Sequence, residues 1–221
     1  NEAIEHVNQL DISAEKHIDH YFKIQKINFL ANIHSGNYRK AKTILNRISA
    51  VLPKNDHYGL YSVEWQIYER YLGLVVNMDN TVISSEHIVE RIEQKEGLPF
   101  ELFFQLSVFN ILNYHSNNRH DLAASEITNL VSSVKTATDG FTCYRMHTFI
   151  KLLILLKKCN FDISLCRNKG RYLYRRLKSD KQCKFGSEIF EVLPYEKIWE
   201  YIIESDKKKQ SFIGTETKTL I

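Results

Sequence analysis

The stretch from Gly36 to Pro53 constrains the fold more than any other, because it predicts a turn, a helix and a helix end in succession. Gly36 has no Cβ and tolerates the positive φ that is common where a helix ends. Leu45 follows Ala41 at helical spacing on the same face, and Ala41 is small enough to let another helix approach. Pro53 cannot continue the helix and moves Leu52 out of the α region. The stretch therefore predicts the second helix of a helix pair.

This stretch resembles the second half of a tetratricopeptide repeat (TPR). Ala41 and Leu45 match the small-x-x-x-large spacing of that family, and Pro53 matches its closing proline. Small residues recur at intervals of 44, 38 and 43 residues, against about 34 in the family, at Ala41, Ser85, Ala123 and Cys166. The resemblance implies stacked helix pairs whose first helices line a concave groove. A generic α-solenoid is the alternative.

Glycine and proline are scarce, with 8 Gly and 3 Pro in 221 residues, which disfavours a turn-rich β sandwich or barrel. We therefore predict an all-α fold, a right-handed α-solenoid of about four antiparallel helix pairs that is TPR-like and ends in a C-terminal capping helix. The predicted domain covers residues 1–205, with pairs at about 12–53, 58–97, 99–135 and 141–180, a cap at 185–205 and a flexible tail at 206–221.

Apolar residues indicate which helix faces are buried. In the first helix of the first pair, the predicted apolar stripe consists of Ile18, Phe22, Ile27, Leu30 and Ala31. In the cap, Pro194 begins a helix, and the side chains expected to pack on the last pair are Ile198, Trp199, Ile202 and Ile203. Gly170 lies inside a predicted helix, where it is unfavourable unless it marks a close helix contact.

The charge of the chain is unevenly distributed. Its formal net charge is +4, but residues 151–184 hold eleven Lys or Arg and two acids, a net +9 that leaves −5 for the rest. One predicted helix in this segment carries the basic stripe, which we define as Arg167, Lys169, Arg171, Arg175, Arg176 and Lys178. Arg167, Arg171 and Arg175 recur every four residues and share one side. Such a stripe suits an acidic protein segment or phosphates, although a solvated helix face is the simpler interpretation.

The TPR resemblance implies a second candidate surface, the concave groove. From helix phase, the predicted groove residues are Lys23, Lys26, Arg70, Asn77, Gln105 and His115. Long paired helices present a large surface that suits a bound peptide or protein segment.

The four cysteines, Cys143, Cys159, Cys166 and Cys183, form no C-x-x-C pair and stand at no zinc-finger spacing from histidines. We interpret them as free thiols on buried helix faces in a reducing, cytoplasmic setting. No run of about 18 apolar residues occurs, so no transmembrane helix is expected. The chain begins with Asn1, so further sequence before it is conceivable.

No catalytic or metal-binding pattern stands in the sequence. His17 and His20 share a helix face but lack the further ligands of a metal site, and His115 and His120 flank a turn. We therefore predict no enzyme activity, metal or cofactor. The leading hypothesis is a non-enzymatic scaffold or regulatory module that binds a protein or peptide in its groove. The alternatives are the peptide-sensing domain of a larger bacterial transcription regulator, and binding of nucleic acid or an acidic partner through the basic segment.

Overall fold

The computed structural model describes residues 18–52, 59–76, 98–137, 144–179 and 191–204. These residues form eight helices and no strand, which confirms the all-α prediction. Seven of the helices are α2 (Ile18–His34), α3 (Tyr38–Val51), α4 (Gly59–Val76), α6 (Phe100–Ser116), α7 (His120–Ala137), α8 (Tyr144–Lys158) and α9 (Ile163–Ser179). The eighth, here called the C-terminal helix, spans residues 195–204. The second helix predicted for the 58–97 pair, the site Ser85 and the tail 206–221 lie outside the described residues.

The chain divides into two compact units, each described by itself. Unit 1 holds α2, α3 and α4, and unit 2 holds α6 to α9 with the C-terminal helix. Whether one array runs through both units, as the domain prediction has it, remains a prediction. None of the described helices is long and apolar enough to cross a membrane.

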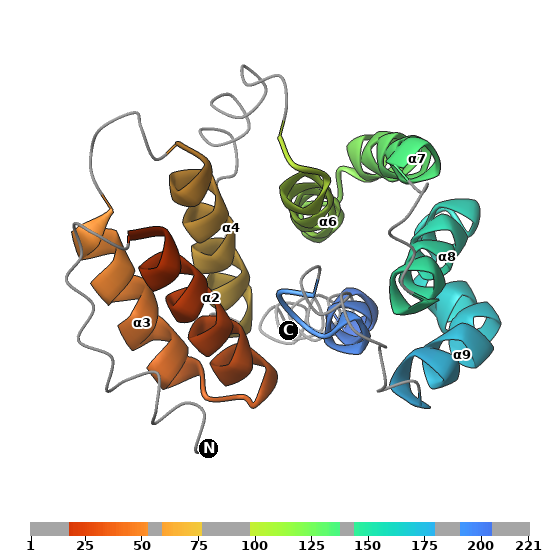
Figure 1. The fold of residues 1–221 in the computed structure, drawn as a ribbon. Coiled ribbons are helices and arrows are strands. Elements are labelled where there is room, and N and C mark those ends of the chain that lie inside the picture. Colours follow the sequence, from red (N-terminus) through yellow and green to blue (C-terminus); the bar gives the residue numbers. More distant parts are fainter. Residues whose placement is uncertain (1–17, 53–58, 77–97, 138–143, 180–190, 205–221) are drawn as a thin grey trace, which may run out of the picture. The chain divides into compact units, whose positions relative to one another are not determined.

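In three helix hairpins, α2–α3, α6–α7 and α8–α9 (Figure 1), the first helix ends with the same pair of backbone hydrogen bonds. After α2, Asn37 N donates to Asn32 O at 2.8 Å and Gly36 N donates to Ile33 O at 3.1 Å. This is a Schellman motif, and Gly36 takes the expected left-handed conformation with φ +76°. Asn118 and Asn160 hold the equivalent position with φ 57° and 50°. Asparagine tolerates this region better than most residues, so these helix ends follow from the local sequence, whereas the third turn adds Phe161 with φ 61°.

The predicted small residues lie fully buried at equivalent places in these hairpins. Ala41, Ala123 and Cys166 are each 0% exposed near the start of the second helix. Leu45 and Ile48 are buried beside Ala41, and Leu52 leaves the α region with ψ 114°. The three small side chains thus allow close helix approach, as the sequence predicts.

Unit 1 is centred on an aromatic cluster. Phe29 of α2 packs against Trp65 and Tyr68 of α4, with ring centroids 5.6 and 5.2 Å away. The predicted α2 stripe is wrong at Ile27, which is 66% exposed, whereas Phe29 is 0% exposed. Counting from Phe22, the buried face advances at helical spacing through Gln25 and Phe29, and Ile27 falls outside it. The buried face of α2 includes polar side chains, so the positions of the apolar residues alone indicated the wrong buried face of this helix.

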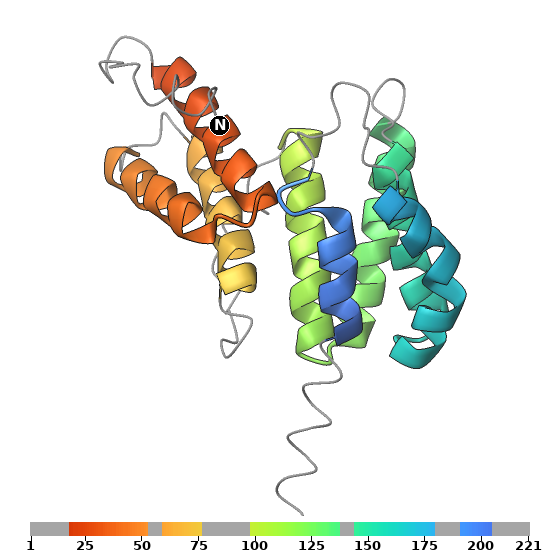
Figure 2. The same ribbon diagram turned by 90° about the horizontal axis from the view of Figure 1, so that it is seen from below.

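Unit 2 surrounds its C-terminal helix. Each of α6 to α9 contacts the next along the chain, and the C-terminal helix lies inside the curve that they make (Figures 1 and 2). Tyr195 packs on Phe104 of α6 and Phe149 of α8, with centroids 6.2 and 4.7 Å away. The predicted apolar positions of the cap are all buried, at Ile198, Trp199, Ile202 and Ile203. The C-terminal helix therefore covers α6 as well as the last hairpin, α8–α9.

Candidate functional site

The basic stripe forms one wall of a cleft in unit 2. The cleft, of about 580 Å³, opens between α9 and the C-terminal helix. Arg167, Arg171 and Arg175 line it because a four-residue spacing keeps them on one side of α9. The remaining lining residues are Asn168, Tyr174, Trp199, Glu200, Ile203 and Glu204. We call this the arginine cleft.

Two of its arginines have no partner among the described residues. Arg167 Nη2 donates to the Ile203 carbonyl at 3.4 Å, a long contact. Arg171 and Arg175 are exposed and make no hydrogen bond or ion pair with the described part of the chain. Their bonding capacity is therefore available to a ligand.

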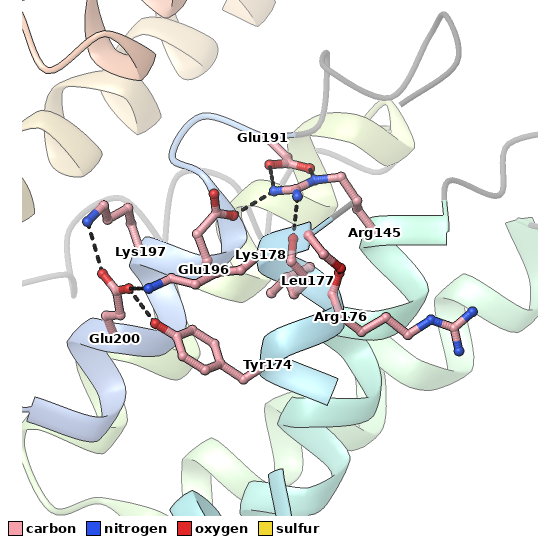
Figure 3. A network of polar contacts seen from close by, with 10 residues as sticks. Arg145, Tyr174, Arg176, Leu177, Lys178, Glu191, Glu196, Lys197 and Glu200 are labelled. Carbon is pink, nitrogen blue, oxygen red and sulfur yellow. Dashed lines mark hydrogen bonds and ion pairs between the residues drawn. The ribbon is translucent and has the colours of Figure 1, made fainter. Parts of the chain in front are cut away.

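The other members of the basic stripe point elsewhere or are already engaged. Lys169 is exposed and does not line the cleft. The Arg176 guanidinium lies 4.3 Å from the ring centroid of Tyr144 on α8, and Figure 3 shows it pointing away from Glu200. Lys178 binds Glu200 at 2.9 Å. The six cations thus do not form one surface.

Glu200 of the C-terminal helix is held by three donors. The Tyr174 hydroxyl and Lys178 Nζ donate to Oε1, and Lys197 Nζ donates to Oε2 at 3.0 Å (Figure 3). Partial burial raises the pKa of Glu200, but these hydrogen bonds outweigh it and lower the pKa to about 2. Tyr174 shows the opposite effect, because burial and then its bond to Glu200 raise its pKa. Glu200 therefore stays ionised and paired, and it neutralises neither Arg171 nor Arg175.

A buried arginine fixes the C-terminal helix beside the cleft. Arg145 of α8 is bidentate to Glu191, with Nε–Oε1 at 2.8 Å and Nη2–Oε2 at 2.9 Å (Figure 3). Nη2 also donates to Glu196 at 2.6 Å, and Nη1 donates to the Leu177 carbonyl of α9 at 2.6 Å. Burial alone lowers the pKa of Arg145, but the glutamates raise it above its ordinary value. None of the sequence-based predictions includes this cluster, whose one visible signal is an arginine in the first turn of the apolar helix α8.

The predicted groove residues of unit 1 have different environments. Lys23 is exposed, whereas Lys26 Nζ lies 2.5 Å from Glu64 Oε1 and is partly buried. Arg70 is half-buried, which lowers its pKa. Asn77 lies outside the described residues.

The predicted groove residues of unit 2 are inaccessible, which corrects that part of the groove prediction. Gln105 and His115 are each 2% exposed. His115 Nε2 lies 3.4 Å from the Ile202 carbonyl, and its ring stacks with His120 and Phe161. The reason is that the C-terminal helix occupies the space beside α6 that helix phase assigned to a partner.

The described cysteines fit a structural role. Cys159 and Cys166 are buried free thiols, as predicted, while Cys143 and Cys183 lie outside the described residues. Burial, followed by the proximity of Cys159, raises the pKa of Cys166 to about 12, so its reactive thiolate is disfavoured. Within the described ranges, no group of three or more His, Cys, Asp or Glu side chains converges to hold a metal.

No family model, curated protein or solved structure matches this chain. The arginine cleft must therefore be interpreted from its own chemistry. It offers two guanidinium groups without a partner among the described residues, an apolar floor and a facing carboxylate, an arrangement that suits binding of an anionic segment.

Proposed function

We propose that the chain is a non-enzymatic, cytoplasmic binding module, a TPR-like helical array that holds an acidic segment of a partner protein in the arginine cleft. The observation that carries the proposal is the pair Arg171 and Arg175, exposed on one wall and unpartnered within the described residues. A guanidinium group matches a carboxylate with two parallel hydrogen bonds. The recurrence of the same hydrogen bonds at the end of the first helix in three hairpins supports the array.

The electrostatics of the cleft favour a peptide over a nucleic acid. Glu200 and Glu204 stand on the wall opposite the arginines. Glu204 is exposed and has no ion-pair partner among the described residues. A continuous strand of phosphates would meet repulsion from Glu204 on that wall, whereas a peptide can present its anionic group to the arginines and a basic or amide group to Glu204.

The floor adds an apolar contribution. Ile203 and Trp199 line the cleft from the C-terminal helix. A volume of about 580 Å³ lies within the range of about 300–1,000 Å³ typical of small-ligand pockets, so it suits a few side chains. The expected partner segment is therefore short, acidic and interrupted by apolar residues.

Nucleic acid is the second candidate ligand, because α9 also carries an exposed aromatic ring outside the residues that line the cleft. Tyr172 is 69% exposed on a helix that carries six cations and no acid. Exposed aromatic rings among cations are typical of single-strand binding surfaces.

The groove of unit 1, with Lys23, Lys26 and Arg70, also remains a proposed peptide surface.

Fluorescence anisotropy of a labelled peptide tests the first proposal. The probe contains three Glu residues separated by Leu, and a matched probe has Gln in place of each Glu. We expect the Glu peptide to bind and the variant Arg171→Glu/Arg175→Glu to weaken binding by about tenfold or more. The control Lys40→Glu/Lys42→Glu makes the same charge change at exposed positions of α3 and should bind normally.

Equal binding of the Glu and Gln peptides would contradict the proposal. A twelve-nucleotide oligothymidine that binds better than the Glu peptide, with a steep loss of affinity as salt rises, would favour the nucleic acid candidate. Circular dichroism of each variant establishes that the helices persist.

A further inference from the structure

All the cations that α9 contributes to the arginine cleft are arginines, although a carboxylate could be bound by lysine as well. The cations that line it from α9 are Arg167, Arg171 and Arg175, whereas Lys169, Arg176 and Lys178 of the same helix do not line it. Arginine differs from lysine in its planar, forked donors, which match phosphate oxygens in pairs.

The spacing of the two unpartnered arginines suits a doubly charged group. Arg171 and Arg175 are one helical turn apart, so their Cα atoms are separated by about 6 Å. Two long side chains at that separation can converge on one anion. A carboxylate carries a single charge, whereas a phosphorylated serine or threonine carries about −1.5 to −2 near neutral pH.

Of the two acids that line the cleft, Glu204 remains on the facing wall, whereas Glu200 does not cancel the positive field of the arginines. Glu200 is paired with both Lys178 and Lys197, and it also accepts a hydrogen bond from Tyr174. Each of its oxygens is thus engaged by a cation, and its charge is already compensated. The described residues therefore leave Arg171 and Arg175 without an ion-pair partner in a partly enclosed space, where charge-assisted bonds are stronger than in open water.

We infer that the arginine cleft recognises a phosphorylated serine or threonine within a peptide segment, with the phosphate bridging Arg171 and Arg175 and a neighbouring apolar side chain on Ile203. This inference rests on the proposed function and specifies its ligand. The arginines stand on an exposed wall and the apolar side chains form the floor, so a short phosphorylated side chain reaches the guanidinium groups. Trp199 is only 3% exposed and offers no ring for a base to stack on, which disfavours an oligonucleotide here.

Three labelled peptides of nine residues provide the test. They are identical, with leucines flanking the central residue and a lysine nearer one end, except that the central residue is phosphoserine, glutamate or serine. Binding to the full chain is measured by anisotropy. The variant Trp65→Phe leaves Trp199, which lines the cleft, as the single tryptophan, so its fluorescence reports occupation of the site.

We expect the phosphoserine peptide to bind about tenfold or more tightly than the glutamate peptide and to change Trp199 fluorescence. Arg171→Lys/Arg175→Lys keeps the charge but removes the forked donors, and should weaken phosphoserine binding about fivefold or more. The control Arg39→Lys/Arg47→Lys makes the same change at exposed positions of α3 and should have no effect.

Equal affinity of the phosphoserine and glutamate peptides would overturn this inference and leave the proposed function standing. Failure of both peptides to bind would overturn both proposals. Two other results would also overturn the inference. One is that inorganic phosphate displaces the peptide fully at a concentration equal to the peptide's dissociation constant, and the other is that oligothymidine binds more tightly than the phosphoserine peptide. In either case the peptide would contribute nothing specific.

Discussion

Gly170 of α9 packs directly beneath Trp199 of the C-terminal helix. A Cβ placed on Gly170 would lie 3.4 Å from Trp199 Cζ2, and 3.2 and 3.3 Å from the Cδ2 atoms of Leu152 and Leu155. The glycine therefore allows α8, α9 and the C-terminal helix to meet closely, which places Trp199 in the arginine cleft. The sequence left two interpretations of Gly170, an unfavourable residue inside a helix or a close helix contact, and the structure confirms the contact.

Enlarging Gly170 should separate these helices. Gly170→Leu should destabilise unit 2 by about 1–3 kcal/mol through overpacking. Gly170→Ala should change stability by less than about 1 kcal/mol, because the gain in helix propensity offsets the crowding. Urea unfolding followed by Trp199 fluorescence in the Trp65→Phe background measures both. Ser164→Leu, at an exposed position of α9, is the control; a loss as large as that of Gly170→Leu would show that the contact is not the cause.

Removing the buried arginine should be among the most damaging changes in unit 2. Arg145→Met leaves Glu191, which is 5% exposed, and Glu196 without their cation, and should cost about 3–5 kcal/mol. Adding Glu191→Gln should recover part of that loss, since one uncompensated charge is removed. The control is Lys151→Met, at an exposed position of α8. Urea unfolding measures each variant. If the loss of stability in the double variant equals the sum of the losses in the two single variants, Arg145 and Glu191 do not interact as the cluster requires.

The stability of unit 2 should depend on pH through Glu200. This carboxylate has a pKa of about 2 when folded against an ordinary 4.5, so its contribution is fully present above pH 4.5 and is lost as pH falls toward 2. The difference in unfolding free energy between the parent and Glu200→Gln should therefore shrink across that window. Unfolding curves at several pH values measure it, with Glu204→Gln as the control on the same helix. A difference independent of pH would contradict the network.

The small residue of the first hairpin should tolerate no enlargement. Ala41 is 0% exposed, and Ala41→Leu should cost unit 1 about 1–3 kcal/mol by overpacking. Ala50→Leu adds the same side chain at an exposed position of α3 and should be nearly neutral. Unfolding followed by Trp65 fluorescence in the Trp199→Phe background reads unit 1. An unchanged midpoint for Ala41→Leu would place Ala41 away from the helix contact.

Local features of the fold were predictable because they depend on a few neighbouring residues. Gly36 adopts a positive φ, and Ala41 and Ala123 are buried, all as the sequence indicates. The stripe Arg167, Arg171 and Arg175 shares one side of α9 for the same reason, since helical periodicity alone decides it.

Features that depend on which helices meet were not predictable. Ile27 is exposed and Phe29 buried because α4 packs on one particular face of α2, and both faces carry apolar residues. Gln105 and His115 are both buried, and His115 contacts Ile202 of the C-terminal helix, 87 residues later in the chain. Nothing near either residue in the sequence encodes that contact.

The sequence by itself determined the all-helical class, most helix ends, the turns and the cationic side of α9, since backbone restrictions and helical periodicity act over a few residues. Only the tertiary structure decided that the C-terminal helix lies among α6, α8 and α9, that Arg145 clamps Glu191 and Glu196, and that three arginines face an apolar floor and a carboxylate wall across a cleft. These features arise from packing between residues distant in sequence, whose surfaces become complementary only after the helices have formed.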